Sequence, residues 1–83
     1  MLNPQRTIDD LKGLRALTGD ENGAQRVAFT DTWLKARAFE RELLSELPVT
    51  VEVDEAGNQW STLKGTSDKE VLIGGHIDSV PNG

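Results

Sequence analysis

The stretch Val71-Leu-Ile-Gly-Gly-His76-Ile-Asp78-Ser-Val-Pro-Asn-Gly83 holds the single histidine of the chain and its most strand-like apolar run. Residues 71–73 are apolar without interruption, which predicts a strand buried on both faces, as in a parallel sheet covered by helices. Gly74 and Gly75 then end the run. We therefore expect an α/β fold in which the following residues lie at the carboxyl end of a strand, where open α/β sheets bind ligands.

His76 and Asp78 follow this strand end and are two residues apart. A neutral imidazole binds a divalent metal through one ring nitrogen, and a nearby carboxylate can accept a hydrogen bond from the other, which fixes the tautomer. We interpret His76 as a candidate metal ligand and Asp78 as the candidate catalytic residue that orients its ring. Imidazole with carboxylates suits zinc, manganese, cobalt or nickel. From this triplet alone, an ordinary hydrogen-bonded histidine is the alternative.

Two helices are predicted upstream. Thr7 and Asp10 fit a variant of the capping box, so the first helix is expected from Ile8 to Thr18, with Gly19 as its C-terminal stop. Its apolar residues recur at helical spacing, which is typical of a helix that packs one face.

The second helix is expected to begin at Thr30 and to run to about Glu46. Phe29 and Leu34 are placed to form a hydrophobic staple across its first turn. Trp33 and Phe39 are interpreted as core anchors rather than as a stacking platform for bases, because no basic face accompanies them.

Residues 49–53 alternate between valine and polar side chains, which predicts a strand with one buried face. Residues 59–63 are expected to return as its hairpin partner, with turn residues at 54–58 between them. Asp54 and Asn58 could be taken for site residues, but hydrogen bonding within the turn is the favoured interpretation. The predicted order is therefore α, α, β, β, β.

Residues 19–29 begin with turn residues and show no sustained period, so a loop is predicted there. Arg26 lies in this loop, where an arginine is by default a solvated charge or a partner in a local ion pair. A structural contribution near the site is conceivable, and no substrate contact is assigned to it.

The composition bounds the function classes. Eighty-three residues make one domain at most, and 14 acidic against 9 basic residues give a net charge of −5. This acidic balance argues against nucleic acid or an anionic membrane as partner, since both bind clustered lysine and arginine side chains. There is no cysteine, signal peptide pattern or long apolar run, so we expect a cytoplasmic protein. The composition says nothing about a small-molecule substrate.

Three separated blocks carry a resemblance to a known family. Residues 74–83 resemble the first metal-ligand motif of the carboxypeptidase and aminoacylase class of metal-dependent amidohydrolases. Together with Arg-Val-Ala-Phe-Thr at 26–30 and Asp-Glu-Ala-Gly-Asn at 54–58, they are similar to the branch of N-carbamoyl-L-amino-acid hydrolases, allantoate amidohydrolases and β-ureidopropionases. The similarity extends from about Asp9 onward, and Gly75 stands where many members have serine.

The resemblance implies that residues 1–83 form a single partial domain. It would be the N-terminal α-α-β-β-β portion of a three-layer α/β/α zinc-peptidase-like catalytic domain. Family members are several times longer, so the aspartate that bridges the metals, a Glu-Glu pair, the general base and the lid or dimerisation domain would follow Gly83. The 83-residue chain alone is expected to be inactive.

The implied activity is hydrolysis of the C–N bond of carbamoyl or ureido groups in linear amides, such as N-carbamoyl amino acids, allantoate or ureidopropionate. The resemblance also implies two divalent metals per full-length active site, most often zinc or manganese, with His76 as a ligand of one of them. It further implies that the full-length protein is a homodimer. The alternative from a different class is a small non-catalytic α/β domain in which the motif is vestigial and an exposed sheet edge binds a protein partner.

Overall fold

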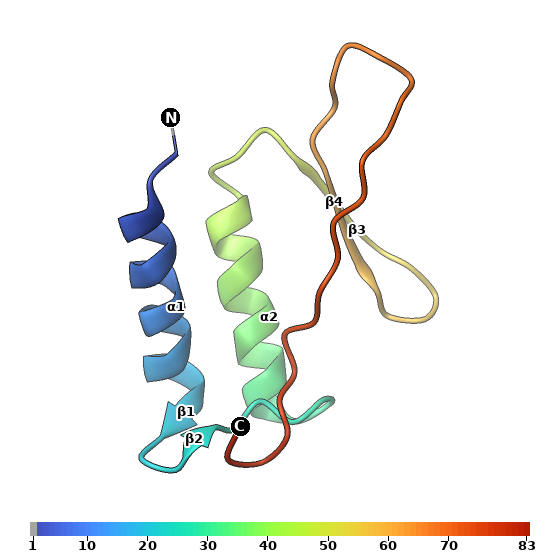
Figure 1. Ribbon diagram of the computed structural model, residues 1–83. Helices are drawn as coiled ribbons and strands as arrows, with labels where there is room; N and C mark the ends of the chain where they lie inside the picture. The colour runs from blue at the N-terminus through green and yellow to red at the C-terminus, as the bar shows by residue number, and fades with distance from the viewer. Residues whose placement is uncertain (1) are drawn as a thin grey trace. The chain divides into compact units, whose positions relative to one another are not determined.

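The computed structural model describes residues 2–83, which form a small α/β fold with two helices and two small antiparallel sheets (Figure 1). The order is α1 (Pro4–Thr18), β1 (Gly19–Asp20), β2 (Gly23–Ala24), α2 (Asp31–Leu44), β3 (Thr50–Val53) and β4 (Gln59–Thr62). The chain divides into two compact units, residues 2–39 with 76–83 and residues 40–75. Both candidate site residues, His76 and Asp78, belong to the first unit.

Helix α1 begins at Pro4, earlier than the predicted start at Ile8. The side chain of Asn3 accepts a hydrogen bond from the backbone N–H of Arg6 at 3.1 Å, and Pro4 occupies the first turn, where its missing N–H has no intrahelical partner to lose. Asn3 is therefore the N-cap, and the predicted cap at Thr7 is wrong because an adequate cap and a helix-starting proline precede it.

The end of α1 at Thr18 confirms the predicted boundary. Gly19 is the C-cap residue, but its φ of −116° is extended rather than left-handed, because the chain continues directly into β1. The predicted loop over residues 19–29 therefore contains a short hairpin of β1 and β2. The carboxylate of Asp20 accepts a hydrogen bond from the backbone N–H of Asn22 at 2.8 Å and stabilises the tight turn between them.

The start of α2 confirms Thr30 as its N-cap, since the Thr30 hydroxyl accepts a hydrogen bond from the backbone N–H of Trp33 at 3.3 Å. The predicted staple between Phe29 and Leu34 is wrong. Phe29 has a φ of 69°, and its ring lies against Trp33 with centroids 5.1 Å apart. Phe29 is 85% exposed and Leu34 52%, so this first turn presents apolar surface to solvent.

The small core of the first unit lies where α2 meets α1. Ala36 is fully buried. A Cβ at Gly13 would stand 3.2 Å from the Phe39 ring, so the glycine that weakens α1 by helix propensity lets this ring pack closely. Phe39 and Trp33 are both partly buried packing residues rather than fully buried core anchors. Trp33 packs against Phe29 and against the Arg37 guanidinium, whose central carbon lies 4.7 Å from the ring centroid.

The predicted hairpin of the second unit is confirmed. Strands β3 and β4 pair antiparallel with Thr50 opposite Thr62 and Val53 opposite Gln59. The predicted burial of one face of β3 is wrong, because all four of its residues are exposed. A two-stranded ribbon has too few side chains to make a core of its own.

The predicted buried strand at 71–73 is also wrong. Residues 70–75 form no strand. Val71, Leu72 and Ile73 are 88%, 74% and 95% exposed. Burial on both faces requires neighbouring strands and covering helices, and within residues 2–83 no strand pairs with this segment.

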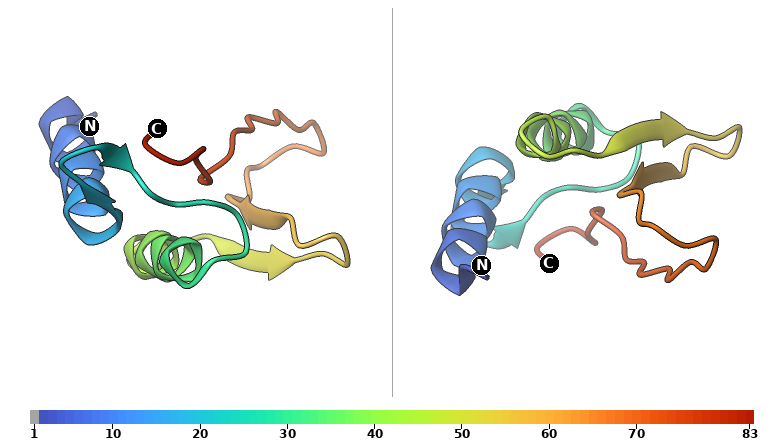
Figure 2. Two further views of the ribbon diagram at one scale, coloured as in Figure 1. Left: turned by 90° about the horizontal axis from the view of Figure 1, so that it is seen from below. Right: turned by 90° about the horizontal axis from the view of Figure 1, so that it is seen from above.

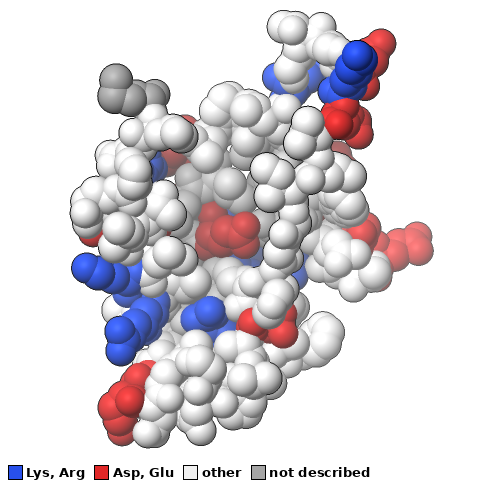
Figure 3. All heavy atoms as spheres, viewed as in Figure 1, with Lys and Arg blue, Asp and Glu red and all other residues white. Residues whose placement is uncertain are grey.

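Charged side chains are dispersed over the face drawn in Figure 3, where acidic and basic atoms of the described residues occur in small separate groups. Neither helix of residues 2–83 is long and apolar enough to cross a membrane.

Candidate functional site

The segment that carries the candidate site is held by a ribbon of backbone hydrogen bonds, here called the terminal ribbon, between residues 24–26 and 79–83. Ala24 and Gly83 exchange two bonds of 2.7 and 3.0 Å, and the Ser79 N–H donates to the Arg26 carbonyl at 2.9 Å. The Ser79 hydroxyl accepts from the Arg26 N–H at 3.0 Å, in place of a backbone carbonyl. The C-terminus accordingly lies beside β2 in Figure 1 and in both views of Figure 2.

A turn at Pro81-Asn82 lets the ribbon close. Proline supplies a fixed negative φ, and Asn82 adopts a φ of 58°, which asparagine tolerates better than most residues. The Gln25 side chain holds this turn through two bonds to Asn82, of 2.8 and 3.1 Å. The same Gln25 amide donates to Asp20 at 3.0 Å, and this hydrogen bond is the main cause of the lowered pKa of the Asp20 carboxyl.

Gly23 allows the backbone of residues 82 and 83 to lie close to β2. Its φ is 128°, and a Cβ built there would collide with the backbone carbonyl of Gly83 and lie 3.0 Å from the carbonyl carbon of Asn82. Only glycine meets both conditions without strain. The position of residues 82 and 83 therefore depends on the absence of a side chain at residue 23.

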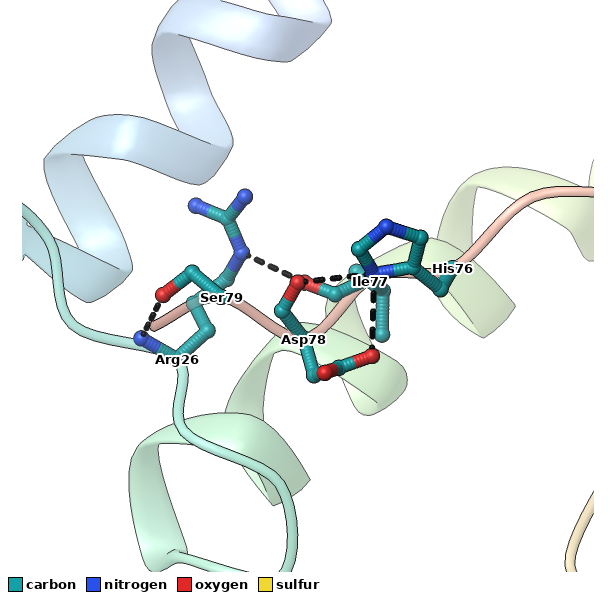
Figure 4. Close-up of polar contacts among 5 residues, drawn as sticks. All are labelled: Arg26, His76, Ile77, Asp78 and Ser79. Atoms are coloured by element: carbon teal, nitrogen blue, oxygen red, sulfur yellow. Dashed lines mark hydrogen bonds and ion pairs between the residues drawn. The ribbon is translucent and has the colours of Figure 1, made fainter. Parts of the chain in front are cut away.

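His76 and Asp78 lie two residues apart, just before the terminal ribbon, and their side chains face each other (Figure 4). The His76 Nδ1 lies 3.0 Å from the Asp78 Oδ1 and 3.0 Å from the Asp78 backbone oxygen. Both oxygens are acceptors, so Nδ1 carries the proton and donates to them. In the neutral ring Nε2 is then left with its lone pair, which is the form of histidine that binds a metal.

The pair is accessible. The His76 side chain is 78% exposed and that of Asp78 43%. An exposed ring with a fixed tautomer can present Nε2 to a ligand outside the described residues. The Asp78 carboxylate accepts a hydrogen bond from the His76 ring, which is the contact expected from the sequence. Metal binding by His76 stays a prediction.

The residues present fit one ligand position of a metal site. His76 supplies an imidazole nitrogen and Asp78 its orienting carboxylate. Within residues 2–83, no group of three or more histidine, cysteine, aspartate or glutamate side chains is gathered closely enough to hold a metal ion. The described residues therefore offer one imidazole, oriented by a carboxylate, and no complete set of metal ligands.

Arg26 is the residue that sequence reasoning undervalued. Its Nε donates to the Ile77 carbonyl at 2.8 Å, and its Nη1 lies 3.4 Å from the Thr18 hydroxyl. The default expectation of a solvated loop arginine is wrong, because its partner lies 51 residues away in the chain. No local pattern could reveal this contact, although Arg26 does open one of the three blocks that carry the family resemblance.

Asp54 and Asn58 are confirmed as turn residues. The Asp54 carboxylate accepts from the backbone N–H of Ala56 at 3.0 Å, from that of Asn58 at 2.9 Å, and from the Trp60 indole N–H at 3.0 Å. These bonds, with the Trp60 indole first, lower the pKa of the Asp54 carboxyl. Its oxygens are occupied within the hairpin, as expected for a structural turn.

Comparison with known proteins gives a similarity to an amidohydrolase. The chain is 31% identical over 65 residues to an allantoate amidohydrolase of Bacillus subtilis (strain 168). The match covers 76% of this chain and 16% of that protein, so the chain spans about a sixth of the relative's length. No family model and no solved structure matches the chain.

Proposed function

We propose that the chain is the N-terminal part of a metal-dependent amidohydrolase that hydrolyses the C–N bond of a carbamoyl or ureido group in a linear amide. The observation that carries this proposal is the His76–Asp78 pair, in which a carboxylate 3.0 Å from Nδ1 leaves Nε2 of an exposed ring with its lone pair, the form that a metal ligand requires. The 31% identity to an allantoate amidohydrolase supports the reaction class.

In this proposal His76 Nε2 binds one of two divalent metals, and zinc and manganese are the first metals to test. A divalent metal held there would polarise the substrate carbonyl and lower the pKa of a bound water to about 7. Asp78 accepts the Nδ1 proton, which keeps the ring in one tautomer and raises the basicity of Nε2. The remaining ligands and the general base would come from residues outside this chain, within a three-layer α/β/α catalytic domain.

The substrate class follows from the relative. Allantoate is the first substrate to test, with an N-carbamoyl-L-amino acid and 3-ureidopropionate as the other linear ureido compounds of the same reaction class. All three carry a carboxylate and a terminal ureido group, so one set of metal-dependent steps can serve each of them.

A second candidate rests on the exposed apolar run at 71–73, since an extended segment with unpaired backbone groups can add a strand to a partner. In this alternative the chain is a small non-catalytic domain that acts through protein–protein contacts. It predicts that the His76 side chain is dispensable.

The experiment uses the full-length protein that carries this chain, loaded with zinc or manganese. It measures the release of ammonia and carbon dioxide from the three substrates, together with bound metal. His76→Ala is expected to lose activity and one metal per site. Lys69→Ala, an exposed change outside the terminal ribbon, serves as the control and is expected to behave as the parent. Full hydrolysis and full metal content in His76→Ala would contradict the proposal.

A further inference from the structure

Arg26 contacts the chain on both sides of Asp78 without contacting Asp78 itself (Figure 4). On one side its Nε donates to the carbonyl of Ile77 at 2.8 Å. On the other its own carbonyl accepts from the Ser79 N–H at 2.9 Å, and its N–H donates to the Ser79 hydroxyl at 3.0 Å. The three bonds connect one residue to both neighbours of the candidate catalytic carboxylate.

These bonds orient the two peptide planes that flank the Asp78 Cα. A peptide unit is planar, so fixing the Ile77 oxygen orients the Ile77–Asp78 unit, and fixing the Ser79 N–H orients the Asp78–Ser79 unit. Two fixed planes around one Cα leave little freedom in its φ and ψ. The directions of the Asp78 Cα–Cβ bond and of its backbone carbonyl are set in consequence. The carboxylate on that Cβ and the carbonyl supply the two oxygens that face His76 Nδ1.

The guanidinium is itself anchored on helix α1. Its Nη1 lies 3.4 Å from the hydroxyl of Thr18, which is buried and donates in turn to the Leu14 carbonyl at 2.7 Å. Thr18 can do both because a hydroxyl has one donor and two acceptor sites. The orientation of Arg26 therefore depends on the last turn of a helix rather than on solvent.

We propose that Arg26 is the positioning residue of the His76–Asp78 pair: through the two peptide planes beside Asp78 it holds the carboxylate and carbonyl that fix the proton of His76 on Nδ1. Its importance for catalysis rests on the proposed function, whereas its effect on the ring tautomer does not. The tautomer of the His76 ring therefore tests the positioning by Arg26 independently of the proposed hydrolase function.

The first test records the ring 15N shifts of His76 in the 83-residue chain at pH 9, where imidazoles are neutral. In the parent, Nδ1 is expected to be pyrrole-like and Nε2 pyridine-like. In Arg26→Gln the two shifts are expected to converge as both tautomers become populated, and Arg26→Lys should lie between, because an ammonium can reach one acceptor but lacks the planar fork that serves two. Arg41→Gln makes the same chemical change in the last turn of α2 and should match the parent.

The second test uses the full-length protein. Arg26→Gln is expected to weaken metal binding about tenfold, the lower end of the effect of losing a partner that orients a ligand. Arg26→Lys should recover part of that loss, and Arg41→Gln should leave the metal dissociation constant unchanged.

Each outcome decides one of the two proposals. A parent-like tautomer in Arg26→Gln overturns the positioning assignment, and so does loss of the helical circular dichroism in both Arg26 variants, which would make Arg26 a residue needed for folding of the whole unit. A disturbed tautomer together with a full-length protein that neither binds metal nor hydrolyses a ureido compound supports the positioning assignment and overturns the proposed function.

Discussion

At the scale of single residues, the charge on Asp78 is the feature that the candidate site uses most directly. Its Oδ1 lies 3.0 Å from a ring nitrogen that must carry a proton, and a hydrogen bond to an ionised acceptor is about twice as strong as one to a neutral acceptor. The side chain is nearly half exposed, so its chemistry can be changed without opening a core.

Asp78→Asn in the full-length protein is expected to lower activity about 10–100-fold while the fold is retained. The amide oxygen can still accept a hydrogen bond, but it has no charge to strengthen the donation from Nδ1. Turnover at saturating metal and circular dichroism are the measurements. Asp68→Asn, at an exposed position outside the terminal ribbon, is the matched control. Parent-like turnover in Asp78→Asn would remove this residue from the site.

Gly23→Ala is expected to destabilise the first unit by about 1–3 kcal/mol, because it places a side chain at a φ of 128° and against the Gly83 carbonyl. Gly57→Ala is the matched control, since Gly57 also has a positive φ, of 89°, but open space around it. Amide exchange should show faster exchange at Ser79 and Gly83 in Gly23→Ala alone. Equal protection of these amides in both variants would show that the terminal ribbon does not depend on the close approach.

At the scale of elements, the β3–β4 hairpin and the extended run at 71–73 differ in how their backbones are satisfied. The hairpin pairs along its length and is closed by the Asp54 carboxylate. The run at 71–73 has apolar side chains in solvent and no strand partner within residues 2–83.

The hairpin is expected to loosen in acid. The pKa of Asp54 is lowered from its ordinary value of 3.8, mainly by the Trp60 indole and then by Asn58. A carboxyl with a lowered folded-state pKa contributes stability that is present above its unfolded value and lost as the pH falls through the folded value. The Trp60 indole N–H resonance, followed from about pH 5 to pH 2, should report this loss.

Asp54→Asn is the control for that measurement and should remove the pH dependence at Trp60. A local signal is needed because the pKa of Asp20 is lowered too, by the Gln25 side chain in the other unit, and would contribute to any global measurement. An indole resonance in the parent that does not move across this range would contradict the assignment.

The run at 71–73 is expected to cause self-association of the chain, because unpaired N–H and C=O groups beside exposed apolar side chains can template strand pairing. Leu72→Lys should reduce association in sedimentation experiments, since a charge on an exposed strand opposes edge-to-edge pairing. Leu63→Lys makes the same change at a residue of similar exposure, 68% against 74%, and should reduce it less. A concentration-independent monomer in the parent would contradict this expectation.

At the scale of the whole molecule, the chain holds one exposed imidazole paired with a carboxylate, and its match covers 16% of the similar allantoate amidohydrolase. A catalytic zinc site uses about three protein ligands. The described residues 2–83 therefore have too few metal ligands for a catalytic site, and the proposed hydrolysis belongs to the full-length protein.

The 83-residue chain is expected to show no measurable hydrolysis of ureido substrates and to bind zinc more weakly than micromolar. One imidazole with an orienting carboxylate gives too few bonds to displace the hydration shell of the ion. Calorimetry with zinc, using His76→Ala as the reference, is the measurement. Micromolar or tighter binding that disappears in His76→Ala would show that the chain completes a site by itself.

The amino-acid sequence alone determined the local elements. Thr30 capped the second helix and Asp54 closed a turn, because each depends on neighbours within about six residues. The alternation at 49–53 predicted a strand, and its partner follows directly after that turn. The spacing of His76 and Asp78 likewise predicted their pairing. The contact of Arg26 with Ile77 was decided by the tertiary structure, since it joins residues 51 positions apart. The run at 71–73 misled the prediction for the same physical reason: apolar composition favours burial, but burial itself is supplied by other segments.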